Sequence, residues 1–216
     1  MNRTVVVIGG GYGGSAVAKA LDAEADVVLV DPRDAFVHSA GSLRALARPD
    51  WADNIFFPYD RLLARGTVVR DRAASVDPGG VTLASGRRVD ADYLVLATGS
   101  SYSFPGKPAG DARSDALDDF RRTHDELASA RHVLIEGAGP VGLELAGEIK
   151  AAWPRTRVTV VAPGDQLLPG FREDVRADLH RQLDELGIRL RLGSRLIAPP
   201  ATEPGRAATF TVTTTD

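Results

Sequence analysis

The chain has 216 residues, of which 44% are hydrophobic and 25% are charged, and its net charge is −3. This near-neutral balance gives no electrostatic argument for nucleic-acid binding, and no run of about 18 apolar residues predicts a transmembrane helix. Because cysteine is absent, disulfides, thiolate metal sites and cysteine redox relays are excluded. The four histidines show no ligand spacing, so no metal site is predicted. We expect a cytoplasmic protein.

The N-terminal segment has the order strand, glycine-rich turn, helix and strand. Residues 4–10, TVVVIGG, form a β-branched run that is typical of a buried parallel strand. Residues 15–23 have helical spacing, and residues 26–31, DVVLVD, predict a second buried strand that ends on an acid. This order predicts a βαβ unit within a parallel sheet.

The turn of this unit carries the pattern G-x-G-x-x-G, in Gly9, Gly11 and Gly14. The first glycine allows a tight turn, the second lets a pyrophosphate approach the backbone, and the third lets the helix lie close to the sheet. Asp31 follows Gly9 by 22 residues, near the ~20 expected of an acid that binds a ribose hydroxyl. The alternative is a tight turn without a ligand, but the flanking strands and the acid favour a nucleotide site.

The remainder of the first half is predicted to be irregular at first and then rich in strands. Residues 32–66 form a long irregular stretch, whose aromatic side chains either face an electron acceptor or anchor the loop. These aromatic residues are Trp51, Phe56, Phe57 and Tyr59. Strands joined by glycine turns are expected at residues 67–77, 80–85 and 87–100.

After a linker-like passage at residues 103–114, the same order of elements recurs. The boundary between two domains is therefore placed so that the first comprises residues 1–108 and the second residues 109–216. Helices are expected at residues 117–130, 141–153 and 172–187, a strand with its glycine turn at residues 132–139, and strands at residues 157–163, 188–196 and 207–216.

The second copy has its own glycine motif, in Gly137, Gly139 and Gly142. Its second strand ends on Ala162 where an acid is usual, so phosphate binding by the backbone is retained but ribose selectivity is not. The alternative is a packing motif that remains from a duplication. The strand that ends near Ala97 in the first copy has its equivalent position beyond residue 216, so we expect the C-terminal part of the second copy to be missing.

Two nucleotide sites in tandem indicate two cofactors that exchange a hydride, and a flavin and a nicotinamide are the natural pair. The stretches VVVIGGGYGG, VDP, LVLATGS and IEGAGPVGLELAGEIK resemble the two-dinucleotide-binding-domain flavoproteins of the pyridine nucleotide-disulfide oxidoreductase superfamily. Within it, FVHSAGSLRAL and FPGK are similar to the branch with the apoptosis-inducing-factor-like, ferroptosis suppressor and type II NADH:quinone oxidoreductase proteins. The resemblance implies an α/β fold with tandem Rossmann-like FAD- and NAD(P)-binding domains of three-layer ββα architecture.

The resemblance also implies FAD in the first copy, NAD(P)H in the second and hydride transfer to the flavin, which then reduces a quinone-like acceptor. The FAD pyrophosphate is expected at the first glycine turn and its adenosine near the end of the second strand. Residues implied for FAD are Gly9, Gly11, Tyr12, Gly13, Gly14, Asp31, Pro32, Ala74, Ala97, Thr98 and Gly99. Residues implied for NAD(P)H are Gly137, Gly139, Pro140, Val141, Gly142 and Glu144.

Three charged residues have open assignments. Glu144 matches the family's acid near the nicotinamide, although an acid in the first turns of a helix is also stabilised by the helix dipole. Lys107 either steadies negative charge on the reduced flavin or is a solvated loop lysine. Arg44 matches the stretch that borders the flavin ring, but support of the core or solvation explains it equally well.

Two departures from the family pattern bear on the function. The family's later glycine–aspartate motif and its C-terminal interface domain are absent from the sequence, so we expect this chain to hold FAD weakly. The alternatives to quinone reduction are single-electron transfer to a protein, as in ferredoxin or rubredoxin reductases, and a non-enzymatic redox-sensing module. A homodimer and a peripheral contact with a membrane are left open.

Overall fold

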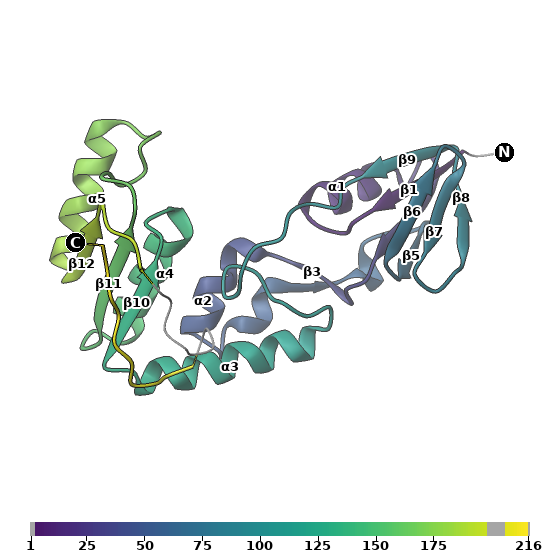
Figure 1. Cartoon of the computed structure of the whole chain (residues 1–216). Helices are drawn as coiled ribbons and strands as arrows, with labels where there is room; N and C mark the ends of the chain where they lie inside the picture. Colours follow the sequence, from purple (N-terminus) through teal and green to yellow (C-terminus); the bar gives the residue numbers. More distant parts are fainter. Residues whose placement is uncertain (1–2, 198–205, 216) are drawn as a thin grey trace. The chain divides into compact units, whose positions relative to one another are not determined.

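The computed structural model describes residues 3–197 and 206–215. The chain forms two compact units, whose elements are labelled in Figure 1. The first unit combines Met1–Ser42 with Trp51–Asp119, and the second combines Leu43–Asp50 with Phe120–Asp216. No helix within the described ranges is both long enough and apolar enough to cross a lipid bilayer.

The first unit is built on a parallel four-stranded sheet, which confirms the predicted βαβ order. Its strand order is β5-β2-β1-β9, and α1 connects β1 to β2. The elements are β1 (Thr4–Ile8), α1 (Tyr12–Leu21), β2 (Asp26–Asp31), β5 (Thr67–Arg70) and β9 (Tyr93–Leu96). The β-branched run of β1 is buried on both faces, as a central strand of a parallel sheet requires.

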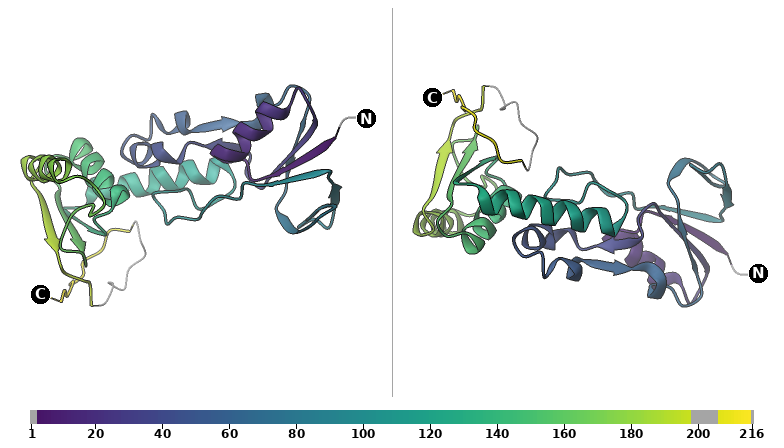
Figure 2. Two further views of the ribbon diagram at one scale, coloured as in Figure 1. Left: turned by 90° about the horizontal axis from the view of Figure 1, so that it is seen from above. Right: turned by 90° about the horizontal axis from the view of Figure 1, so that it is seen from below.

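Three layers make up the first unit, and alternate residues of β1 contact the two outer layers. Val5 and Val7 pack with Ala18 of α1, whereas Val6 and Ile8 pack with Val81 of an antiparallel meander. The helix and the meander therefore cover opposite faces of the sheet (Figure 2). The meander consists of β6 (Ala73–Asp77), β7 (Gly80–Leu83) and β8 (Arg88–Asp90). The expected ββα architecture is confirmed here.

Two runs that the sequence predicted as single strands are each divided between two sheets. The run at residues 67–77 comprises β5 and β6, and the run at residues 87–100 comprises β8 and β9. In the second run the chain turns at Asp92, whose carboxylate accepts a hydrogen bond from the N–H of Thr4 at 2.7 Å. The prediction was wrong because β-branched periodicity continues through the change of sheet.

The stretch at residues 32–66, which was predicted to be irregular, contains short ordered elements. Strands β3 and β4 pair in antiparallel fashion, and α2 lies between them in the sequence. The elements are β3 (Ala35–Val37), α2 (Ser42–Ala47), β4 (Phe56–Pro58) and the 3₁₀ helices η1 (Ser39–Gly41), η2 (Ala52–Ile55) and η3 (Tyr59–Arg61). None of them has more than six residues, too few for a hydrophobic period to be recognised.

The second unit repeats the parallel arrangement with strand order β10-β11-β12. Its helices pack on the sheet around a core that includes Leu143, Ala146 and Leu183. The elements are α3 (Arg113–Ser129), β10 (His132–Glu136), α4 (Pro140–Ala152), β11 (Arg157–Ala162), α5 (Glu173–Glu185) and β12 (Ile188–Leu192). Helix α3 starts four residues before the predicted helix at residues 117–130, inside the expected linker.

The strand predicted at residues 207–216 is not formed in its described part. Residues 206–215 contain one isolated antiparallel bridge, in which Thr214 pairs with Leu196, and residue 216 lies outside the described residues. The alternating threonines and hydrophobic residues favour a strand, but a strand needs a paired neighbour over its length. Among the described residues, the second unit consists of one parallel sheet and its helices. The antiparallel layer that the ββα architecture predicts for this unit is not formed there.

The compact units differ from the predicted boundary at residues 108/109. The first unit continues to Asp119 because the start of α3 is bound to it: the N–H of Arg113 donates to Asp34 at 3.0 Å and its Nη2 donates to Asp53 at 2.6 Å. The functional domain limits stay a prediction, since a compact unit is defined by packing and a binding domain by its ligand.

Helix α2 belongs mainly to the second unit, although its sequence interrupts the first. Its side chains Leu43 and Leu46 are 3% and 1% exposed. His124 of α3 lies with Nδ1 at 3.0 Å from the carbonyl oxygen of Leu46, and its ring packs on Trp153. The segment Leu43–Asp50 is therefore carried by the second unit.

Candidate functional site

The first glycine turn connects β1 to α1. Gly9 has a φ of 102°, which glycine adopts without strain, and its N–H donates to the carbonyl oxygen of Val30 at 2.8 Å. Gly11 caps α1 without a side-chain hydrogen bond. The first N–H groups of the helix are therefore open to an anion, which the helix dipole also favours.

The glycines of this turn divide into two kinds. A Cβ atom at Gly14 would lie 1.7 Å from the carbonyl oxygen of Gly9, and one at Gly9 would lie 2.3 Å from the carbonyl oxygen of Ala97. A Cβ atom at Gly11 or Gly13 would meet no atom of the chain within 4 Å. Gly9 and Gly14 are thus required by packing, while Gly11 and Gly13 leave space in which a ligand can approach the backbone.

Asp31 ends β2 beside this turn and is 7% exposed. Its Oδ2 accepts a hydrogen bond from the N–H of Gly10 at 2.6 Å, and its Oδ1 accepts one from the N–H of Arg33 at 2.8 Å. These two bonds fix the orientation of the carboxylate next to the glycine turn. The predicted contact with a ribose uses the lone pairs that remain, as carboxylate oxygens accept more than one hydrogen bond each.

Ala74 and Pro32 were the other residues assigned to the adenosine. Ala74 is exposed and lies at the irregularity of the β6–β7 pairing, where the register passes from Ala73 to Ser75. Such a position leaves backbone groups unpaired, which suits a contact with adenine. The carbonyl oxygen of Pro32 accepts a hydrogen bond from Nε of Arg70 at 3.4 Å.

The segment after β9 passes beside the glycine turn, as the sequence predicted. The N–H of Ala97 donates to the carbonyl oxygen of Ile8 at 2.8 Å, and the Ala97 carbonyl is the group that excludes a side chain at Gly9. Thr98 and Gly99 are exposed, and Gly99 has a φ of 71°. The structure therefore brings this segment together with the turn.

Lys107 is bound to the residue that follows this segment. Its Nζ donates to the carbonyl oxygen of Ser100 at 2.6 Å and to Oγ of Ser100 at 3.1 Å. Within the residues that the structure describes, Lys107 forms no ion pair. These neutral oxygens leave room for an anionic partner of the ammonium group, and the role of Lys107 beside a reduced flavin stays a prediction.

His38 was assigned no function from the sequence, but it contacts the first residue of α1. The N–H of Ala40 donates to the hydroxyl oxygen of Tyr12 at 3.3 Å, and the same oxygen lies within hydrogen-bond distance, 2.9 Å, of Nδ1 of His38. The Tyr12 ring also meets Phe36 edge-on, with a centroid distance of 5.1 Å. No short-range pattern indicates this pairing, because it joins two segments of different elements.

Two of the four aromatic residues at 51–59 anchor the loop to the core. Tyr59 is 6% exposed, its hydroxyl donates to the carbonyl oxygen of Gly10 at 2.9 Å, and burial followed by the charge of Asp31 raises the pKa of Tyr59 far above its usual value. Phe56 is also buried, whereas Phe57 is 54% exposed. The structure thus favours loop anchoring over an acceptor-facing wall for Phe56 and Tyr59.

The second glycine turn, between β10 and α4, reproduces the first. Gly137 has a φ of 112°, and its N–H donates to the carbonyl oxygen of Val161 at 2.8 Å. A Cβ atom at Gly142 would lie 2.1 Å from the carbonyl oxygen of Gly137, whereas one at Gly139 would meet nothing within 4 Å. Gly139 caps α4 without a side-chain bond, and Pro140 follows it, where a missing N–H costs nothing.

The two turns differ in their surroundings. Ala162, at the end of β11, stands where Asp31 stands at the end of β2, and it offers no acceptor to a ribose. Arg172, which lies beyond it in sequence, is 81% exposed and pairs with Asp174 at 2.5 Å. A side chain at Gly137 would meet no atom within 4 Å, since β10 is an edge strand of its described sheet.

Helix α4 presents the candidate acid of the second turn. Glu144 is exposed and lies one turn along α4, while Val141 precedes Gly142 in the first turn of the helix. Glu148, one turn further, binds Arg44 of α2, with Nη2 at 2.8 Å and Nε at 2.9 Å from Oε1. The hydrogen bond and charge of Glu148, with a contribution from Glu144, raise the pKa of Arg44.

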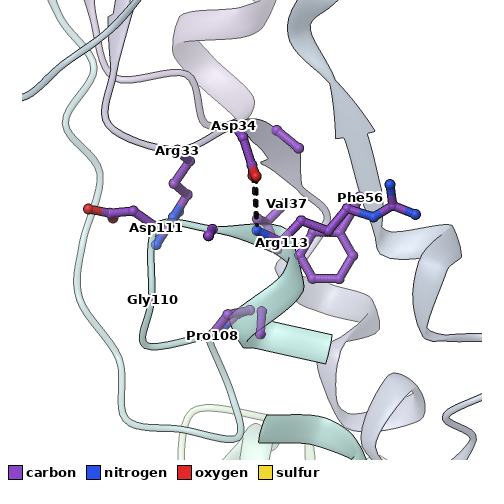
Figure 3. Close-up of a pocket in the computed structure, with 11 residues that line it drawn as sticks. Arg33, Asp34, Val37, Phe56, Pro108, Gly110, Asp111 and Arg113 are labelled. Carbon is purple, nitrogen blue, oxygen red and sulfur yellow. Dashed lines mark hydrogen bonds between the residues drawn. The ribbon is translucent and has the colours of Figure 1, made fainter. Parts of the chain in front are cut away.

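A small cleft of the first unit includes Arg33, Asp34, Asp111 and Arg113 (Figure 3). The N–H of Arg113 donates to Asp34 across it. The cleft leaves no room for a water molecule, so we assign it no ligand. Within residues 3–197 and 206–215, no group of three or more histidine, aspartate or glutamate side chains could hold a metal ion.

Comparison with known proteins identifies the family of the two glycine turns. The model of the family described as pyridine nucleotide-disulphide oxidoreductase matches residues 3–214. The match confirms the predicted superfamily, whose members are FAD-dependent NAD(P)H oxidoreductases. The chain has no cysteine, and it therefore lacks the redox-active thiols that the word disulphide implies.

The chain is similar to two curated relatives from the predicted branch. Ferroptosis suppressor protein 1 of Taeniopygia guttata is 36% identical over 203 residues, which cover 89% of this chain and 52% of the relative. Apoptosis-inducing factor homolog B of Dictyostelium discoideum is 32% identical over 206 residues, which cover 91% and 53%. The chain spans about half the length of the curated relatives it matches.

The fold is also found in solved structures. A chain of the crystal structure of the covalent putidaredoxin reductase–putidaredoxin complex matches with a TM-score of 0.77 at 22% identity, over 99% of this chain and 55% of that chain. At this identity the likeness concerns the fold. Sequence similarity over nearly all of the chain carries the assignment, and the protein belongs to the pyridine nucleotide-disulphide oxidoreductase family.

Proposed function

We propose that the protein is an FAD-dependent NAD(P)H oxidoreductase that reduces a quinone-like acceptor. The observation that carries the proposal is the repetition of one phosphate cradle in two units. In each unit the third glycine lies against the carbonyl of the first, and the second glycine caps a helix with open N–H groups. Two such cradles in one chain of this family suit two dinucleotides.

The first cradle suits FAD. Asp31, whose carboxylate is oriented by backbone N–H groups, suits the adenosine ribose, and the exposed Ala74 at the irregularity of the β6–β7 pairing suits the adenine. Bound FAD supplies the hydride-accepting ring, so the protein needs no side-chain nucleophile. The chain's own part is to bind, to orient and to supply charge, for which Lys107 is the candidate.

The second cradle suits a pyridine nucleotide. Its N–H groups follow Gly139 at the start of α4, and Glu144 lies one turn further along the helix. The absence of an acid at Ala162 removes the group that both accepts hydrogen bonds from the ribose and repels a 2′-phosphate. We therefore propose that both NADH and NADPH are used.

The proposed electron acceptor is a quinone-like molecule. A quinone is supported by the likeness of the motifs to the branch that contains type II NADH:quinone oxidoreductases. The alternative is a small redox protein, which the putidaredoxin complex exemplifies for its own reductase. A cytoplasmic location and a homodimer remain part of the proposal and are tested by fractionation and by light scattering.

Anaerobic spectroscopy tests the proposal. The protein is supplemented with FAD, NADH is added, and the absorbance of oxidised flavin is followed; a short-chain quinone or a ferredoxin-type protein is then added. We expect bleaching with NADH and recovery with the quinone. Recovery with the redox protein alone would favour the alternative, and persistent oxidised flavin in the FAD-bound protein would contradict the oxidoreductase assignment.

A further inference from the structure

Gly10 lies in the first glycine turn, at a position where the motif G-x-G-x-x-G does not require glycine. The structure gives a reason for glycine there: a Cβ atom at Gly10 would lie 2.2 Å from the hydroxyl oxygen of Tyr59. Ala138, which has a Cβ atom, stands at this position in the second turn, and all four tyrosines of the chain precede residue 103. The contact with a tyrosine therefore belongs to the first turn.

The backbone of Gly10 is bound on both its acceptor and its donor side. Its carbonyl oxygen accepts a hydrogen bond from the hydroxyl of Tyr59 at 2.9 Å and another from Oγ of Ser15 at 2.7 Å. Its N–H donates to Oδ2 of Asp31 at 2.6 Å. Because a carbonyl oxygen has two lone pairs, the two hydroxyl groups use both of them. The direction of this carbonyl is therefore fixed.

The carbonyl of Gly10 and the N–H of Gly11 belong to one planar trans peptide group, in which the two bonds point in opposite directions. The carbonyl points toward the buried side chain of Tyr59. The N–H of Gly11 therefore points away from that side chain, at the exposed residue that caps α1. Among the described residues this N–H has no backbone acceptor, so it can donate to an anion at the start of the helix.

Tyr59 is itself held in place at this turn. Its side chain is 6% exposed, and because burial raises its pKa, the hydroxyl keeps its proton at neutral pH and remains a donor. The carboxylate of Asp22, at the C-terminal end of α1, accepts hydrogen bonds from the N–H groups of Ala64 and Gly66, each at 2.6 Å. The segment at residues 59–66 is thus bound at both ends of the helix whose cap it orients.

We propose that Tyr59 is a positioning residue of the first turn: its hydroxyl, together with that of Ser15, holds the Gly10 carbonyl so that the N–H of Gly11 donates to the diphosphate of FAD. Without these hydroxyl groups the peptide can rotate and turn the partial negative charge of its carbonyl oxygen toward the anion. Tyr59 acts through Gly10, because its own hydroxyl lies in the core of the first unit. This inference rests on the proposed binding of FAD in that unit.

NMR titration with ADP, which carries the diphosphate, and with adenosine, which lacks it, tests the inference. In protein with isotope-labelled glycine, the amide signals of Gly11 and Gly139 report binding at the two turns separately, and their loss in Gly11→Val and Gly139→Val assigns them. In Tyr59→Phe we expect ADP to bind about threefold to tenfold more weakly at Gly11, the effect of one lost hydrogen bond. Binding of ADP at Gly139 and of adenosine at either turn should stay within about twofold of the unaltered protein.

Ser15→Ala removes the second hydroxyl and is expected to give the same pattern, so it tests the inference even if Tyr59→Phe does not fold. Tyr93→Phe is the matched control. Tyr93 begins β9, whose other end lies beside the end of β1 from which the glycine turn follows, and its hydroxyl contacts Arg3. Its loss should change the affinity for neither ligand.

Two results would overturn the positioning role. One is an equal weakening of ADP and adenosine at Gly11, which would indicate a general loosening of the unit, and the other is an unchanged affinity for ADP. Failure of both ADP and FAD to shift the Gly11 signal of the unaltered protein would instead contradict the proposed function itself.

Discussion

The carbonyl oxygen of Gly9 occupies the place of a side chain at Gly14, 1.7 Å from the position that a Cβ atom would take. In the second unit the carbonyl oxygen of Gly137 occupies the same place relative to Gly142, at 2.1 Å. A helix can approach the strand that precedes it this closely only where the third glycine of the motif, Gly14 or Gly142, lacks a side chain. The two cradles are therefore built by the same contact.

The first prediction separates glycines that pack from glycines that face a ligand. Gly14→Ala forces the backbone apart and should destabilise the fold by about 1–3 kcal/mol. Gly13→Ala, in the same helix, meets no atom within 4 Å and should stabilise the fold by about 0.5–1 kcal/mol, because alanine favours a helix. Urea unfolding measures both, and equal stabilities would contradict the packing described for Gly14.

The second prediction concerns the choice between NADH and NADPH. Ala162 neither accepts hydrogen bonds from the ribose nor repels a 2′-phosphate, so the two cofactors should differ by less than about tenfold in kcat/KM, or about 1.4 kcal/mol. Ala162→Asp should shift the preference toward NADH. Steady-state rates decide the matter, and a hundredfold preference for NADH in the unaltered protein would show that another residue supplies the acid.

The third prediction concerns pH. Partial burial of the ring, followed by the charges of Arg157 and Arg189, lowers the pKa of His132 below its usual value, and Nε2 of His132 lies 2.9 Å from Oγ1 of Thr159. As the pH falls below about 6.5, the unfolded chain takes up a proton that the folded chain resists, so stability falls with pH in this window.

His132→Gln removes this group and should flatten the pH dependence. Urea midpoints from about pH 7.5 to about pH 5.5 are compared for the two proteins. Stability of the unaltered protein should decline more steeply than that of the variant. Parallel curves would show that the surroundings of His132 do not oppose its protonation.

Sequence reasoning predicted the regular parts of the fold well because each has its own local signal. The strands β1, β2, β10 and β11 contain β-branched residues, and the glycine turns follow β1 and β10 at the expected positions. Antiparallel pairing could not be predicted as well, since it depends on partners distant in sequence. The change of sheet at Asp92 and the missing strand at Thr214 are both of this kind.

The residues of the candidate sites likewise divide into those with a local sequence signal and those without one. The glycines and Asp31 could be found from spacing, because spacing along a βαβ unit determines position in space. The contact of His38 with Tyr12 and the ion pair of Arg44 with Glu148 join residues 26 and 104 positions apart. Nothing in either local pattern indicates the partner, so these contacts emerge only from the folded chain.

The central claim is that the first turn binds FAD and the second binds the pyridine nucleotide. Equilibrium titration of FAD and of NADH into Gly11→Val and Gly139→Val tests it most directly, because neither side chain meets the chain's own atoms at its Cβ. We predict that Gly11→Val loses FAD and retains NADH, and that Gly139→Val loses NADH and retains FAD. Unchanged affinities in both variants, or loss of the same ligand in both, would contradict the assignment.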